Sequence, residues 1–192
     1  MGATIVKMDK NVSKIFDIKI RPYSDDDMLV LEKTLGDPSQ MIHLNGPENH
    51  ERLERRHEEY VRMSIDPIAG CMYTITVDSG SVPVGHTGYW ETEWNGEKGW
   101  ETGWFVIPEF QGKGIATAAM RILIDQLATL NIDSVFAYPS VTNEASNAIS
   151  KKLGFTVIEE MDYEYPRESG KLLRCNVWKL DLIKYRENKA VQ

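Results

Sequence analysis

The segment PEFQGKGIATAAM, residues 108–120, places two glycines and a lysine directly before a long apolar helical pattern. Glycine costs backbone entropy, so Gly112 and Gly114 indicate a backbone that must stay bare and flexible. A helix N-terminus offers free N–H groups and the positive end of the helix dipole, and both favour a phosphate group. The segment therefore predicts a phosphate-binding loop.

Two common phosphate loops do not fit the spacing. A Walker A loop needs Gly-Lys-Ser/Thr, but Lys113 is followed by Gly114 and no glycine stands at the required upstream position. A dinucleotide fingerprint needs G-x-G-x-x-G, and the segment GKGIAT ends in Thr117. The phosphate ligand is therefore of another kind.

Hydrophobic periodicity places this loop between a strand and a helix. We expect helices from the caps in YSDDD to about Leu35, over 49–64, over 115–130 and over 143–154. We expect strands over 16–22, 71–77, 84–94, 99–107, 133–139, 155–161 and 172–182. Asn95-Gly96 is a hairpin signal between two of them. This order predicts a mixed α+β fold, with a mainly antiparallel central sheet flanked by helices. The first ten residues and the tail from about Tyr185 are polar, and we expect them to be loose.

Composition narrows the class of protein. The chain has 192 residues, 29 acidic against 22 basic, and a net charge of −7. This balance argues against nucleic acid as a partner and is compatible with a cationic substrate. No apolar run approaches the roughly 20 residues that cross a membrane. The start MGATIVKMDK has no long apolar region, and Val6 stands where a myristoylation signal needs Ser or Thr, so we expect a cytoplasmic protein without a membrane partner. Cys71 and Cys175 match no metal spacing, and we expect no metal.

Two motifs, correctly spaced across a strand, resemble those of the GNAT superfamily of N-acetyltransferases. FVIPEFQGKGIA resembles its Q/R-x-x-G-x-G/A pyrophosphate loop, and NEASNAISKKLGF resembles its second signature. The pattern E-x-G-W at Glu101, with N-x-x-S at Asn143, is most similar to the branch of ribosomal-protein alanine N-acetyltransferases. The resemblance covers about residues 16–182 and implies one acetyltransferase domain over 1–192 with the acyl-CoA N-acyltransferase fold.

The resemblance also implies acetyl-coenzyme A as cosubstrate. The N–H groups from Gln111 to Ala116 would form a nest for its pyrophosphate, and the N–H near Val106 would polarise the thioester carbonyl. Lys113 could contact a phosphate or be a solvated loop lysine. Asn143 would bind the pantetheine arm or anchor its helix. The residues expected around the coenzyme are Phe105, Val106, Gln111, Gly112, Lys113, Gly114, Ile115, Ala116, Thr117, Asn143 and Ser146.

Acetyl transfer to an amine needs a base, because an alkyl ammonium has a pKa of about 10.4. By resemblance, Glu101 is the expected base, acting directly or through water. Glu91, Glu93 and His86 are rivals. Many family members place a Tyr at position 150 to protonate the leaving thiolate. This chain has Ser150, a poorer acid, and Ser150 or Ser146 could hold a water or be a plain helix residue.

The expected acceptor site contains Trp90, Glu91 and Trp104, whose aromatic faces and carboxylate suit a cation. The segment 162–169 could form a second lip over it. Three functions stay open. The first is acetylation of a small, cationic primary amine, aminoglycoside- or polyamine-like, by direct attack on the thioester. The second is acetylation of a protein N-terminus. The third is a non-catalytic sensor of acetyl-coenzyme A, which the serine at position 150 suggests. A homodimer is compatible with each.

Overall fold

The computed structural model describes residues 16–78, 80, 82–130, 132–166 and 169–190. Within them one mixed sheet has the strand order β1-β2-β3-β4-β5-β7-β6. Only the β4–β5 pair is parallel, and the other neighbouring strands are antiparallel. The strands are β1 (Lys19–Pro22), β2 (Gly70–Val77), β3 (Val82–Trp94), β4 (Glu97–Val106), β5 (Ser134–Ala137), β6 (Thr156–Glu164) and β7 (Leu172–Asp181). The predicted mixed α+β fold is confirmed.

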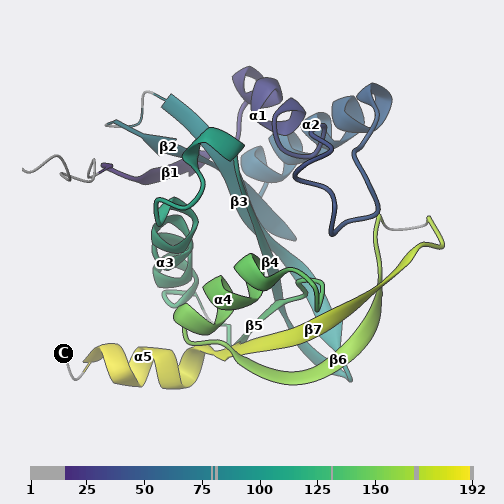
Figure 1. The fold of residues 1–192 in the computed structure, drawn as a ribbon. Helices are drawn as coiled ribbons and strands as arrows, with labels where there is room; N and C mark the ends of the chain where they lie inside the picture. Colours follow the sequence, from purple (N-terminus) through teal and green to yellow (C-terminus); the bar gives the residue numbers. More distant parts are fainter. Residues whose placement is uncertain (1–15, 79, 81, 131, 167–168, 191–192) are drawn as a thin grey trace, which may run out of the picture.

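Helices cover both faces of this sheet (Figure 1). One core cluster joins α1 and α2 to the sheet through Leu31, Leu53 and Met72. Another joins α3 to the opposite face through Leu123 and Val135. The helices are α1 (Met28–Glu32), α2 (His50–Ile65), α3 (Ile115–Leu127), α4 (Glu144–Lys152) and α5 (Leu182–Ala190), with short 3-10 turns at Asp25–Asp27 and Pro108–Phe110. None of these helices is long and apolar enough to cross a membrane.

The β3–β4 hairpin is the longest antiparallel pair and has the predicted turn. Asn95 and Gly96 both have positive φ angles, 50° and 81°, as a two-residue turn of this type requires. This turn sets Trp94 opposite Glu97, and the same register pairs Trp90 with Glu101. Two residues that were expected at the site therefore lie on one face of neighbouring strands.

Two predictions, that the tail from about Tyr185 is loose and that the first helix runs to about Leu35, were wrong. The tail after Tyr185 belongs to α5, which is fixed because the Tyr185 hydroxyl donates to Asp125 Oδ1 at 2.6 Å and Arg186 donates to the Ile132 carbonyl at 2.8 Å. The first helix is shorter than expected. Ser24 and Asp27 form a capping box around a 3-10 turn, and α1 ends at Glu32. The first ten residues lie outside the described part of the chain.

Candidate functional site

The two parallel strands separate near the middle of the sheet. β4 and β5 pair only at Trp100–Val135 and Glu101–Phe136. Beyond these pairs a cleft of about 1280 Å³ opens, lined by the end of β4 and by Ala137–Ser140 on the other side. The remaining walls are formed by α2, by the loops before α2, α3 and α4, and by residues of β2, β3 and the end of β6. A pocket this large, at a break in a sheet, is the expected place for a ligand.

The backbone at the end of β4 offers donors to this cleft. The Ile107 N–H donates to the Val84 carbonyl of β3 at 2.8 Å. Because successive N–H groups of a strand point to opposite sides, the Val106 N–H points away from β3 and toward the opening. The Val106 carbonyl points the same way and accepts a 2.9 Å bond from Gln111 Nε2. This orientation suits the predicted role of the Val106 N–H as a donor to a carbonyl oxygen.

The glycine loop lies next to this strand end. Gly112 and Gly114 have φ angles of 70° and 78°, and a Cβ added to either would meet no atom within 4 Å. The first hydrogen bond of α3 runs from the Ala118 N–H to the Gly114 carbonyl. The N–H groups of the preceding helical residues are therefore outside the helical ladder and can bind an anion. The open space and free donors fit a pyrophosphate group.

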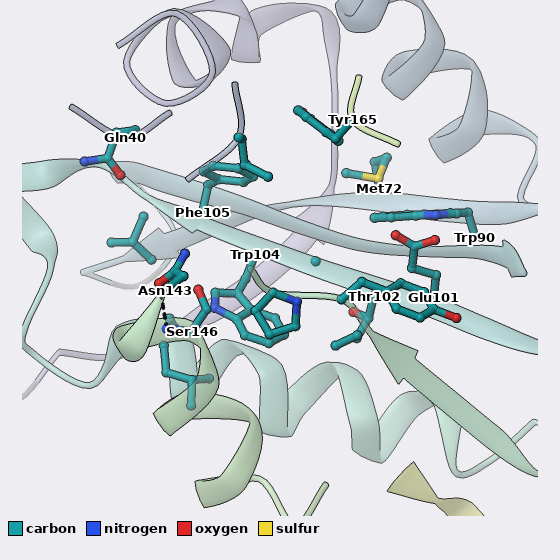
Figure 2. A pocket seen from close by; sticks show the side chains of 18 of the residues that line it. Gln40, Met72, Trp90, Glu101, Thr102, Trp104, Phe105, Asn143, Ser146 and Tyr165 are labelled. Atoms are coloured by element: carbon teal, nitrogen blue, oxygen red, sulfur yellow. Dashed lines mark hydrogen bonds between the residues drawn. The ribbon is translucent and has the colours of Figure 1, made fainter. Parts of the chain in front are cut away.

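All but one of the residues expected around the coenzyme line the cleft. They are Phe105, Val106, Gln111, Gly112, Gly114, Ile115, Ala116, Thr117, Asn143 and Ser146. The exception is Lys113, whose ammonium donates to the Glu109 carbonyl and lies 5.3 Å from the Phe110 ring centre. In this position Lys113 folds back on its own loop. Asn143 caps α4, since its Oδ1 accepts from the Ser146 N–H at 3.0 Å (Figure 2), as the helix-anchor alternative predicted.

Ser150 does not face the cleft. Its side chain is fully buried, its hydroxyl donates to the Ser146 carbonyl at 3.1 Å, and it is absent from the residues that line the pocket. A serine bonded to its own helix backbone is a structural residue. The expected acid or water-holding role of Ser150 therefore has no support from the geometry.

Glu101 lies deep in the cleft and is 6% exposed. Its Oε1 accepts a hydrogen bond from the Tyr163 hydroxyl at 2.8 Å. Figure 2 shows the carboxylate pointing toward Trp90, with Met72, Phe105 and Tyr165 along the same side. A buried carboxylate between apolar and aromatic walls is well placed to take a proton from an amine.

The three expected acceptor residues do not lie together. Trp90 faces the same side as Glu101, its partner across the hairpin. Trp104 is three residues after Glu101 and so lies on the opposite face of β4. There it packs on the α3 core, and it lines the same cleft as Asn143 and Ser146, which are labelled with it in Figure 2. Its buried Nε1 has no hydrogen-bond partner within the part of the chain that is described. This placement moves Trp104 to the coenzyme side. Glu91 is exposed at the rim.

The acceptor side also holds one buried ion pair. Arg56 donates to Glu48 from Nε at 2.9 Å and from a terminal nitrogen at 2.5 Å, and the side chains are 21% and 2% exposed. The Tyr165 hydroxyl adds a 3.4 Å bond to Glu48. Because these two charges neutralise each other, the pair adds little net charge to the cleft beside Glu101. Tyr163 and Tyr165 line the same cleft, in agreement with the expected second lip. Residues 167–168 of that segment lie outside the described residues.

His86 was a rival base, and the structure argues against it. The ring is 2% exposed, stacks on Phe105 at 5.0 Å between ring centres, and does not line the cleft. Burial, with a smaller contribution from the Arg56 charge, lowers the pKa of His86 to about 3. So weak a base cannot compete for an ammonium proton. Among the residues that the structure describes, no group of three His, Cys, Asp or Glu side chains could hold a metal.

We expect the unfolding free energy of His86→Phe to fall less steeply than that of the wild type as the pH decreases. The folded-state pKa of about 3 lies below the ordinary histidine value, so the unfolded chain binds the extra proton. Stability from the neutral ring is complete above pH 6.5 and is lost as the pH falls toward 3. Removing the group reduces the slope of unfolding free energy by up to about 1.4 kcal/mol per pH unit. Urea unfolding between pH 7 and 4 measures it. His50→Gln, at an exposed histidine, is the control for losing one histidine from the chain. An unchanged slope in His86→Phe would contradict the argument.

Comparison with known proteins places this geometry in a family. The family model described as "Acetyltransferase (GNAT) domain" matches residues 17–156. Spermidine N(1)-acetyltransferase of Escherichia coli K12 is 36% identical over 61 residues, which are 31% of this chain and 33% of that protein. The putative ribosomal N-acetyltransferase YdaF of Bacillus subtilis is 41% identical over 56 residues, 29% of this chain and 31% of that protein. The matched segment thus spans about a third of these curated relatives.

Solved structures share the fold over almost their whole length. Spermidine N-acetyltransferase from Vibrio cholerae, in complex with CoA and spermine, has a TM-score of 0.71 at 18% identity and covers 88% of this chain and 98% of its own. Ribosomal-protein-S5-alanine acetyltransferase from Vibrio fischeri has a TM-score of 0.68 at 18% identity, with 89% and 97% covered. At this identity the likeness establishes the fold alone.

Proposed function

Because the chain belongs to the GNAT acetyltransferase family, we propose that it is an acyltransferase that transfers the acetyl group of acetyl-coenzyme A to the primary amine of a small cationic molecule. One observation carries the proposal. A single cleft holds an open glycine loop at one side of the β4–β5 opening and a buried carboxylate, Glu101, at the other. The first suits a pyrophosphate and the second suits an ammonium group.

The proposed reaction is a direct attack. Glu101 takes a proton from the ammonium group, directly or through water, and the neutral nitrogen forms a bond to the thioester carbon. The Val106 N–H donates to the carbonyl oxygen as negative charge develops on it. The attacking nitrogen then releases its second proton to solvent and the carbon–sulfur bond breaks. The thiolate leaves and, with a pKa near the cysteine value of about 8.5, takes a proton from solvent.

Acidic residues in the cleft, the net charge of the chain and the names of similar proteins support a cationic acceptor. Glu59, Asp66 and Glu91 line the cleft on the acceptor side, and Trp90 provides an aromatic face beside Glu101. The chain as a whole carries a net charge of −7. The E. coli relative is named for spermidine, and the V. cholerae structure contains spermine. These facts favour a polyamine-like or aminoglycoside-like amine.

A protein N-terminus is the second candidate, and the length of the cleft favours it. Lining residues on α2 and just after it run from Arg52 to Asp66, a helical rise of about 20 Å, which is enough for roughly six extended residues. Arg52 and Arg62 alternate there with Glu59 and Asp66, so that wall offers both signs of charge to a peptide. Several structural relatives are named for ribosomal proteins.

We expect thiol release from acetyl-coenzyme A when the protein meets a polyamine or an aminoglycoside. The set of acceptors tested should also include amino acids and short peptides that begin with Ala or Ser. Thiol release should be followed with a thiol reagent at pH 7–9. Mass spectrometry of the product then shows an added acetyl group on one nitrogen. Release with peptides only would overturn the small-amine proposal in favour of the second candidate. Coenzyme binding without release from any amine would overturn both.

A further inference from the structure

A tyrosine far from Glu101 in the sequence contacts it directly. Tyr163, on β6, donates its hydroxyl to Glu101 Oε1 at 2.8 Å, and both side chains line the cleft. β6 is the edge strand, separated from β4 in the sheet by β5 and β7. The long β6–β7 hairpin curves round and brings its far end toward the acceptor side (Figure 1). A hydroxyl donated to a carboxylate stabilises the ionised form and fixes its orientation.

The Tyr163 ring is held in place by other aromatic rings. It stacks on Tyr138 with ring centres 5.1 Å apart and planes at 21°. Tyr138 in turn stacks on Phe136 at 6.4 Å and 4°. Phe136 is the partner of Glu101 in the parallel ladder. The stack therefore links Tyr163, which bonds to the Glu101 carboxylate, to Phe136, which pairs with the Glu101 backbone. This linkage fixes the Tyr163 hydroxyl relative to β4.

The end of the β6–β7 hairpin is also held by hydrogen bonds. Asn45, in the loop before α2, donates from Nδ2 to the Tyr165 carbonyl at 2.7 Å. The Tyr165 hydroxyl reaches Glu48 at 3.4 Å. Tyr163 thus lies between two fixed points, the ring stack and this contact, and its hydrogen bond does not depend on a free strand end.

Two ionisable side chains near Glu101, Tyr138 and Cys175, have raised pKa values. Burial, together with the charge of Glu101, raises the pKa of Tyr138 to about 12 and that of Cys175, on β7, to about 11. Both are therefore neutral at ordinary pH. Across the cleft, Arg56 of α2 is paired with Glu48, which also accepts from Tyr165.

We infer that Tyr163 is a positioning residue for the proposed base: its hydroxyl aims the Glu101 carboxylate and keeps it ionised in a buried site. The inference rests on the proposed function. Without the hydroxyl, Glu101 should protonate at higher pH and lose its fixed orientation. The substitution Tyr163→Phe removes this oxygen and keeps the ring, so the stack on Tyr138 is retained.

The test is Tyr163→Phe, followed through the pH dependence of kcat/KM with the best acceptor. We expect about a tenfold loss at pH 7 and an acid limb that moves up by about one pH unit, while KM for acetyl-coenzyme A is unchanged. In a Glu101→Gln background the same substitution should have no further effect, because the carboxylate it serves is gone. Tyr185→Phe is the matched control. It removes a hydroxyl that donates to a carboxylate, Asp125, at 2.6 Å outside the cleft, and it should keep the wild-type profile.

A pH profile of Tyr163→Phe that superimposes on the wild type would overturn the inference, whatever happens to the rate. Additive losses in the double variant would overturn it too. A second readout is independent of turnover. The infrared carboxylate band that disappears in Glu101→Gln can be titrated in the coenzyme-bound protein, and its midpoint should rise in Tyr163→Phe. An unchanged midpoint contradicts the role of Tyr163, whereas a raised midpoint in a protein that acetylates no amine would overturn only the proposed function.

Discussion

Glu101→Gln is expected to lower kcat/KM by about 100-fold or more at pH 7, within the range that general-base catalysis provides. An alkyl amine with a pKa of about 10.4 is almost wholly protonated at neutral pH, so the enzyme must remove a proton before the nitrogen can attack. Glutamine keeps the shape of the side chain and can still accept from Tyr163, but it cannot take that proton. The measurement is the rate of thiol release with a fixed acceptor.

The loss should shrink as the pH rises toward 10. Solvent then supplies the neutral amine, and the base becomes less necessary. Coenzyme affinity should stay unchanged by calorimetry, since Glu101 lies on the acceptor side. Glu93→Gln is the matched control. It removes an exposed carboxylate of β3 that does not line the cleft, and it should behave as the wild type. A Glu101→Gln profile parallel to the wild type at every pH would mean that another group is the base.

The sequence predicts the parts of this site that depend on local chain geometry. The glycine loop is one, because positive φ angles at Gly112 and Gly114 and a following helix are encoded within a few residues. The pairing of Trp90 with Glu101 is another. A two-residue turn at Asn95-Gly96 fixes the register of the whole hairpin, so this contact follows from counting outward from the turn.

Strand alternation also carried a signal that was missed. Glu101 and Trp104 are an odd number of residues apart on one strand, so their side chains must point to opposite faces. The sequence could therefore have separated Trp104 from the acceptor site. For Ser150 no such rule was available, because which face of α4 is buried depends on how that helix packs on the rest of the protein.

Contacts that depend on the order of strands in the sheet cannot be read from local patterns. The Tyr163–Glu101 bond joins residues 62 positions apart, on two strands that are separated in the sheet by β5 and β7. The α5 helix is a similar case. Its sequence is polar and lacks an apolar stripe, and it is held by side-chain bonds to Asp125 and to the Ile132 carbonyl. Neither bond has a signature within the helix itself.

Gly114→Glu is expected to weaken binding of coenzyme A by about 1000-fold. The new carboxylate would stand in the space proposed for the pyrophosphate, where a Cβ now meets no atom within 4 Å. Two unit charges about 4 Å apart near a protein surface repel by about 4 kcal/mol, which corresponds to that loss of affinity. Calorimetric titration with coenzyme A measures it, and thermal unfolding shows whether the fold is kept.

Backbone strain must be separated from charge in this experiment, because Gly114 has a φ of 78° and any side chain there is strained. Gly96→Glu is the control. Its φ is 81°, a Cβ there also meets nothing within 4 Å, and it lies at the β3–β4 turn, away from the cleft. We expect Gly96→Glu to lose similar stability and to keep its coenzyme affinity. Equal affinity in the two variants would place the phosphates elsewhere, whereas a loss confined to Gly114→Glu ties them to the N-terminus of α3.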